Sequence, residues 1–171
     1  MKKASLLAAF LILSAFLFAC SASIEDEKKK TLEDVEHIFN EEAKKTNEET
    51  DEISFRLPFT ASVAEESEHN VIIERSNNTF VLFHHRNDEA GNDVIYNMTT
   101  GSTEEPWLVN ETFEEEGRFG YVLLRQVDEE QVEIVTGIND VKMTTVSEVK
   151  DVSSNAKWMM ETVRSAKWNK E

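Results

Sequence analysis

Hydrophobic and polar residues follow two different periods along this chain, and the change of period separates predicted helices from predicted strands. In the segment 32–45, apolar residues recur every three or four positions, which is typical of one face of an α-helix. Thr31 stands just before this segment as a suitable N-cap. The segment 153–168 has the same period, with Ser153 or Ser154 as its cap. The pattern therefore predicts one helix near the start of the folded domain and one at its end.

Between these helices the period is two, which is typical of half-buried β-strands. Ile53, Phe55 and Leu57 alternate with polar residues until Pro58 ends the pattern. We expect residues 60–70 to form a loop, because no regular alternation runs through them. Further predicted strands cover residues 71–74, 79–86, 93–99, 107–113, 119–127, 132–138 and 141–149.

The order of these elements predicts an α+β fold. Short strands joined by tight turns favour antiparallel pairing, so residues 53–149 are expected to form a mostly antiparallel sheet of about six or seven strands. The two helices are expected to pack on this sheet within a single domain. The predicted strand 79–86 is apolar on both faces, and we expect such a strand inside a sheet that is covered on both sides. Its apolar run consists of Phe80, Val81, Leu82 and Phe83.

The N-terminal segment has the pattern of a secretory signal peptide. Lys2 and Lys3 give a positive start, and an apolar run over residues 6–18 follows. This run is shorter than the ~20 residues that a membrane-spanning helix needs. We therefore expect residues 1–19 to be a cleaved signal peptide rather than a retained membrane helix.

The end of the apolar run resembles the lipobox of bacterial lipoproteins. It reads Leu17-Phe18-Ala19-Cys20. The resemblance implies that the Cys20 thiol carries a diacylglycerol group and that Cys20 becomes the new N-terminus. Its acyl chains, such as palmitate, would then anchor the protein on the outer side of the cell membrane. Residues 20–30 would form a tether and residues 31–171 a single domain. The alternative is an ordinary secreted protein in which Cys20 lies near the cleavage site by chance.

The cysteine content also limits the chemistry of the exported domain. Cys20 is the only cysteine of the chain, so no disulfide can form within the domain that follows it. The domain must then be stabilised by its own core. Acylation of Cys20 would leave no thiol for catalysis.

The chain is strongly acidic. It has 34 Asp and Glu residues against 18 Lys and Arg residues, which gives a formal net charge of −16. Nucleic acid is excluded as an expected partner, because binding to phosphates requires basic patches. Two interpretations stay open: a surface that attracts cations or a basic partner, and solubility in an unusual external medium.

A second resemblance covers much of the chain after the signal peptide. The segments 53–59, 71–74, 79–83 and 137–145, together with the methionine-bearing final helix, are similar to small lipoproteins of Bacillus-type bacteria. These proteins have no settled activity. The resemblance implies a protein of the Gram-positive cell envelope and transfers no catalytic residue to this chain.

The adjacent pair His84 and His85 is the first place to look for a site. Neighbouring residues on a strand point to opposite faces, so the two imidazoles are not expected to bind one metal ion together. Either one could join an acid from a neighbouring strand, which makes both weak candidates for metal ligands. The simpler alternative is that each has a hydrogen-bond partner at the end of a core strand. No metal ion or other cofactor is expected, since no zinc-type spacing accompanies the pair.

Three acidic clusters, at 65–66, 114–116 and 128–130, are the other candidates for ligand binding. Calcium binding is one interpretation, because hard cations prefer several oxygen ligands. The spacing does not match an EF-hand loop, however, and solvated turns are the expected structure. We expect His37 on an exposed helix face and His69 in a loop.

The sequence contains no GxSxG, SxxK, HExxH, Walker or dinucleotide-binding motif, and no catalytic residue is predicted. The leading hypothesis is a non-enzymatic binding module, tethered to the membrane by Cys20, with a protein or another envelope component as its partner. The first alternative is a hydrolase of envelope polymers with a site of dispersed carboxylates. The second is a lipoprotein that binds divalent cations weakly.

Overall fold

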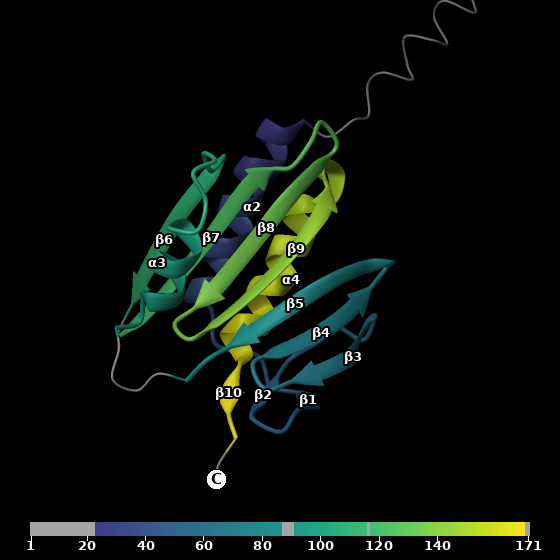
Figure 1. Cartoon of the computed structure of the whole chain (residues 1–171), viewed down its shortest axis with the longest axis vertical. Helices are drawn as coiled ribbons and strands as arrows, with labels where there is room; N and C mark the ends of the chain where they lie inside the picture. Colours follow the sequence, from purple (N-terminus) through teal and green to yellow (C-terminus); the bar gives the residue numbers. More distant parts are fainter. Residues whose placement is uncertain (1–22, 87–90, 116, 170–171) are drawn as a thin grey trace, which may run out of the picture.

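The computed structural model describes residues 23–86, 91–115 and 117–169, and in them it confirms the predicted α+β fold (Figure 1). A seven-stranded sheet has the order β3-β4-β5-β9-β8-β7-β6, and each neighbouring pair is antiparallel. Its strands are β3 (Ala61–Ser67), β4 (Asn70–Arg75), β5 (Asn78–His84), β6 (Val109–Glu115), β7 (Arg118–Gln126), β8 (Gln131–Ile138) and β9 (Val141–Glu148).

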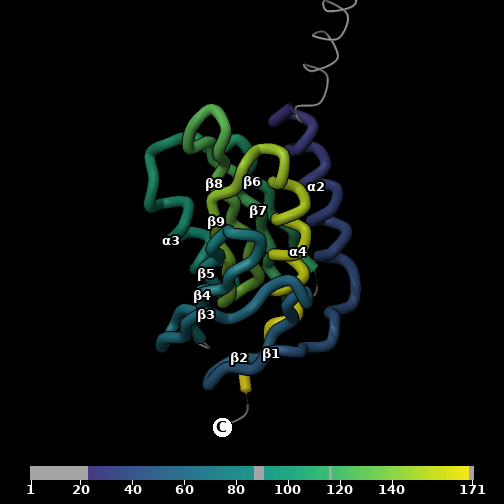
Figure 2. The backbone as a smooth tube through the Cα atoms, turned by 90° about the vertical axis from the view of Figure 1, so that its right-hand side faces the viewer, coloured from purple at the N-terminus to yellow at the C-terminus, as the bar shows by residue number. Residues whose placement is uncertain are grey.

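Two long helices cover one face of this sheet. They are α2 (Ile24–Asn40) and α4 (Val152–Ser165), which lie side by side behind the strands in Figure 1 and to one side of them in Figure 2. A short 3₁₀ turn, η1 (Val149–Asp151), leads from β9 into α4. The core lies between the helices and the sheet, where apolar side chains of both layers are buried. They include Val35, Ile38, Phe39, Phe80, Leu82, Val122, Leu124, Ile134, Met143, Ala156, Met159, Met160 and Val163.

A second, three-stranded sheet joins the segment that follows α2 to the C-terminal residues. It consists of β1 (Glu48–Glu49), β2 (Ile53–Phe55) and β10 (Lys167–Trp168), with β2 in the middle. The pairing of Trp168 with Ile53 places the C-terminal residues beside the turn that precedes β2. Asn169 continues this contact, because its backbone N–H donates to the carbonyl oxygen of Glu52 at 2.8 Å.

The first helix begins earlier than the sequence pattern predicts. It starts at Ile24 rather than after Thr31, and Ser23 caps it by accepting a hydrogen bond from the N–H of Asp26 at 3.2 Å. Residues 24–30 are therefore helical, and their assignment to the tether is wrong. The reason is that Glu27, although charged, points into the molecule and makes a tertiary contact with α4. The helix ends at Asn40 rather than at residue 45, since Glu41 has an extended backbone.

The predicted loop at 60–70 is wrong as well. Residues Ala61–Ser67 form β3, an edge strand whose side chains are mostly exposed. A bulge between Val63 and Glu65 shifts its register against β4. An exposed edge strand with a bulge has no regular apolar alternation, so the hydrophobic pattern of the sequence does not predict it.

The predicted strand at 93–99 is in fact the helix α3 (Val94–Thr100). The hydroxyl groups of Thr99 and Thr100 donate to the carbonyl oxygens of Ile95 and Tyr96, four residues earlier. The β-branched residues that suggested a strand are thus accommodated in a helix. Packing decides the outcome, because the Tyr96 ring lies against aromatic residues of β7.

The other predicted strands match the structure to within two residues at each end. The final helix ends at Ser165, and the residues after it enter β10 instead of continuing to 168. Its N-cap is Asp151, so neither Ser153 nor Ser154 takes that place.

The face of the sheet opposite α2 and α4 is only partly covered. The side chains of Phe80 and Leu82 are buried under the helices, as expected, but Val81 and Phe83 are only half-buried. The helix α3 covers the β7 end of this face, where Tyr121 is buried. The expectation that β5 is covered on both sides is therefore wrong for the side away from the helices, and an apolar surface is left in contact with solvent.

Candidate functional site

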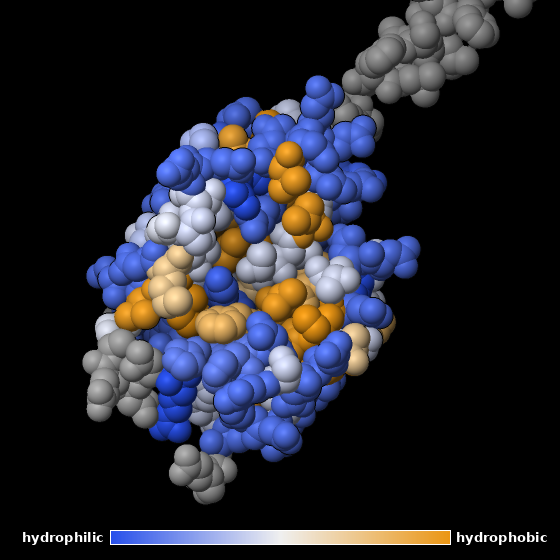
Figure 3. Space-filling view, in the orientation of Figure 1, coloured by the Kyte–Doolittle hydropathy of each residue, from blue (hydrophilic) through white to orange (hydrophobic). Residues whose placement is uncertain are grey.

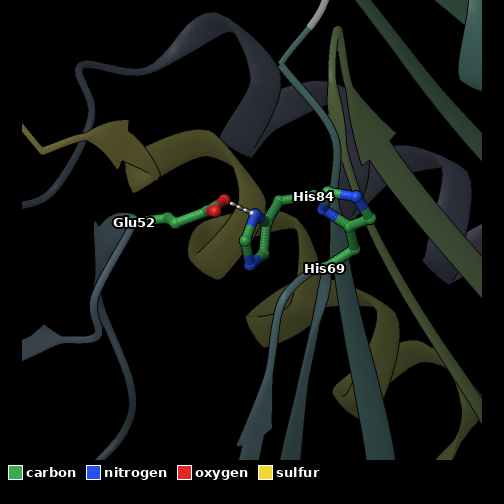
Figure 4. Close-up of side chains that lie close together, drawn as sticks. All are labelled: Glu52, His69 and His84. Atoms are coloured by element: carbon green, nitrogen blue, oxygen red, sulfur yellow. Dashed lines mark ion pairs between the residues drawn. The ribbon is translucent and has the colours of Figure 1, made fainter.

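Three ionisable side chains from distant parts of the sequence meet at the end of β5 (Figure 4). His84 is the last residue of β5, His69 lies in the turn between β3 and β4, and Glu52 lies in the turn before β2. A potential ligand atom of each residue lies within 4.8 Å of those of the other two. We refer to Glu52, His69 and His84 as the histidine cluster.

His84 is the buried member of the cluster. Only 1% of the residue is exposed, and neither of its ring nitrogens has a hydrogen-bond partner among the described residues. Oε2 of Glu52 lies 3.3 Å from Nδ1 of His84. Burial lowers the pKa of His84, and the neighbouring Glu52 carboxylate opposes this effect only in part. The imidazole is therefore neutral near pH 7 and keeps a lone pair available.

His69 approaches the same point from the neighbouring turn. Its Nδ1 is also buried without a hydrogen-bond partner in the described part of the chain. Its ring is perpendicular to that of His84, with 6.3 Å between the ring centroids. The position of the turn is fixed, because the backbone carbonyl of His69 accepts a hydrogen bond from the N–H of His84 at 3.0 Å.

The turn that carries Glu52 is held by hydrogen bonds from both sides. Nδ2 of Asn169 donates to the carbonyl oxygen of Thr50 at 2.8 Å, and Oε1 of Glu66 accepts from the N–H of Asp51, also at 2.8 Å. The Glu52 side chain itself is half-exposed and points from this turn to the His84 ring (Figure 4). The carboxylate is thus presented to the histidines from a fixed backbone.

The structure places the two histidines that the sequence singled out in different surroundings. His84 is buried while His85 is exposed, and the His85 ring lies against that of His69, with 4.9 Å between the centroids. The partners of His84 are Glu52 and His69, neither of which was a candidate. Contacts between turns that are far apart in the sequence bring them together, and no local sequence signal records those contacts.

The second feature is the open face of the sheet, defined here by the side chains of Ile72, Val81, Phe83 and Val146. Strand pairing aligns Ile72 with Val81 in one row and places Val146 opposite Glu133. Val146 is 44% exposed, and the other three are half-buried. In Figure 3 apolar side chains gather in the middle of this face, with polar residues around them.

Acidic side chains surround the open face. Glu65 is the cross-strand partner of Ile72, Glu74 follows Ile72 on the same side of β4, and Glu148 follows Val146 on the same side of β9. All three are exposed. Lys142 lies on the same side of β9 as Val146, with its Nζ 5.6 Å from the centre of the Phe83 ring, and burial lowers its pKa. The face therefore combines an apolar centre with a predominantly acidic border.

Among the described residues, the acidic clusters of the sequence add no member to a group that could hold a metal ion. Asp128 closes its own turn, since its Oδ1 accepts from the N–H groups of Glu130 and Gln131. Glu115 pairs with Arg118 across the β6–β7 hairpin. Cys20, the predicted lipidation site, lies outside the described residues.

Comparison with known proteins adds little to this picture. No protein-family model matches the chain, and no characterised protein matches it in sequence. A crystal structure from Bacteroides thetaiotaomicron VPI-5482 is similar, with 16% identity and a TM-score of 0.37. The match covers 70% of this chain and 46% of the other, so this chain spans less than half the length of that protein. A likeness at this level carries no argument about function.

Among the described helices, none has the length and apolar character needed to cross a membrane.

Proposed function

We propose that this protein is exported and anchored by Cys20 to the outer side of a bacterial cell membrane, and that its domain is a non-enzymatic module that binds an envelope protein. The signal-peptide pattern and the lipobox support the anchored location. The observation that carries the binding role is the open face, where an apolar centre remains in contact with solvent.

The chemistry of the open face defines the kind of partner. Apolar side chains at its centre favour a partner with exposed apolar residues, since their burial drives association. The exposed Glu65, Glu74 and Glu148 around it, with a net charge of −16 on the whole chain, favour basic residues at the partner's rim. The proposed partner is therefore a protein whose apolar contact surface has a basic border.

The anchor is tested by the variant Cys20→Ala. The unchanged protein is expected in the membrane fraction of its native cells, and labelling with a fatty-acid analogue should mark it. The variant has no thiol to acylate, so we expect it to lose the label and to leave the membrane fraction. Retention of the unlabelled variant on the membrane would contradict the proposed anchor.

The binding role is tested by the variant Val146→Arg. Val146 is 44% exposed, so the domain should stay folded with arginine at this position, while a positive charge on the open face should repel a basic partner. We expect at least a tenfold loss of partner binding, or about 1.4 kcal/mol or more. The control is Phe59→Arg, the same type of change at a residue that is 98% exposed and lies outside the open face. Equal binding by both variants would refute a role for the open face.

A further inference from the structure

We propose that Glu52, His69 and His84 bind one Zn²⁺ ion. Two imidazole nitrogens and one carboxylate oxygen form a ligand set found in zinc sites with three protein ligands and one open position. Imidazole ligands also favour zinc over calcium or magnesium, which prefer oxygen. This inference goes beyond the proposed binding role and does not depend on it.

The distances in the histidine cluster suit a tetrahedral ion. Ligands placed about 2.0–2.1 Å from Zn²⁺ in tetrahedral geometry are about 3.3 Å apart from one another. Nδ1 of His84 and Oε2 of Glu52 are 3.3 Å apart, which matches this separation. The ligand atoms of the cluster lie within 4.8 Å of one another, so each separation has to shorten by at most about 1.5 Å to complete the set.

Three ring nitrogens of the histidine cluster lack a hydrogen-bond partner among the described residues. A buried polar atom without a hydrogen bond costs about 1–3 kcal/mol. Both ring nitrogens of His84 and Nδ1 of His69 are in this state in the described part of the chain. A metal ion bound through one nitrogen of each ring would give these lone pairs a partner and so remove part of this cost.

The three residues of the histidine cluster are preorganised by the contacts around them. The turn that carries Glu52 is held by Asn169 and Glu66, and the carbonyl of His69 is bonded to the backbone of β5. The Trp168 ring packs edge-on against His84, with 5.6 Å between the centroids, and shields one side from water. Zinc would thereby link the β3–β4 turn, the end of β5 and the turn next to β10. The fourth position would be left for a water molecule.

Metal titration of the full chain tests the proposal. The protein is purified from membranes in detergent, stripped with EDTA and titrated with ZnCl₂ by calorimetry. We expect one ion per chain with a Kd below about 10 µM, and a rise in the unfolding temperature that EDTA reverses. Co²⁺ in the same site should give the intense visible absorption of a four-coordinate ion. Ca²⁺ should give no saturable heat.

Two variants on the exposed turns, Glu52→Gln and His69→Gln, each remove one ligand and leave the core intact. Each is expected to weaken zinc binding by at least about tenfold, since even outer-shell changes cost 10–100-fold. The control is His37→Gln, which removes an exposed histidine of α2 that pairs with Glu41 just after the helix and should leave the Kd unchanged. A Kd above about 10 µM for the unchanged protein, or an unchanged Kd in either ligand variant, would overturn the proposal.

Discussion

Replacing Gly137 with alanine is expected to destabilise the domain by about 2–3 kcal/mol. Gly137 lies directly opposite Tyr121 in the β7–β8 pair, and the buried Tyr121 ring lies across it. A Cβ atom at position 137 would come within 2.5 Å of the Tyr121 hydroxyl oxygen and closer still to Cζ and Cε1. The ring is packed against Tyr96 and Phe119 and has no free space to enter. Chemical denaturation of the purified protein measures the change in the free energy of unfolding.

The sign of this change identifies the contact as its cause. In a strand without such a contact, replacing glycine with alanine stabilises by roughly 0.5–1 kcal/mol, because the unfolded chain loses freedom. Removing the ring in Tyr121→Leu should therefore reduce the cost of Gly137→Ala to below about 1 kcal/mol. The variant Gly91→Ala is the control, since among the described residues only the side-chain Oδ1 of Asp93 lies near its new Cβ. A stabilising effect of Gly137→Ala in the unchanged background would show that Tyr121 does not occupy this space.

Replacing Glu27 with alanine is expected to cost about 2 kcal/mol of stability. Glu27 lies on α2 and is 7% exposed, and its Oε2 accepts a hydrogen bond from the backbone N–H of Ser153 at 2.8 Å. This N–H belongs to the first turn of α4, where Asp151 makes no side-chain capping bond. A carboxylate at that place satisfies a free donor and also interacts favourably with the positive end of the helix dipole. One helix thus caps the other.

The comparison with two other variants separates the hydrogen bond from the charge. Glu27→Gln keeps an acceptor oxygen and should cost only about half as much as Glu27→Ala. Glu25→Ala removes an exposed acid from the same turn and should change stability by less than about 0.5 kcal/mol. A fragment that begins at residue 31 lacks Glu27 and should be as unstable as Glu27→Ala, or more so. Equal stability of the Glu25→Ala and Glu27→Ala variants would contradict the capping contact.

The sequence predicts most of the large sheet because hydrophobic patterns mark its inner strands. Strands such as β5 and β9 alternate between buried and less buried positions, so an apolar period of two marks them, whereas β7 is marked by a continuous buried run. The edge strand β3 lacks such a pattern because Val63 is its only large apolar residue. The helix α3 is predicted wrongly as a strand, because tertiary packing of Tyr96 outweighs the strand propensity of its β-branched residues.

The start of α2 and the histidine cluster were missed for a related reason. A run of charged residues suggests a solvated tether, and nothing local shows that Glu27 caps a helix more than a hundred positions later in the chain. His84 was a candidate only as part of a pair, whereas its partners come from turns at Glu52 and His69. Contacts between distant turns depend on strand pairing, and a single sequence does not contain that information.

Site-specific crosslinking in intact cells tests the central claim, that the open face of the anchored domain binds a protein partner. A photoreactive amino acid is placed at Val146 on the open face and, as the control, at Lys29 on the helix-covered side, where the side chain is 80% exposed. The account predicts a discrete crosslinked protein from position 146 that is absent from position 29 and whose contact surface is basic. No adduct at position 146, or the same adducts from both positions, would contradict it.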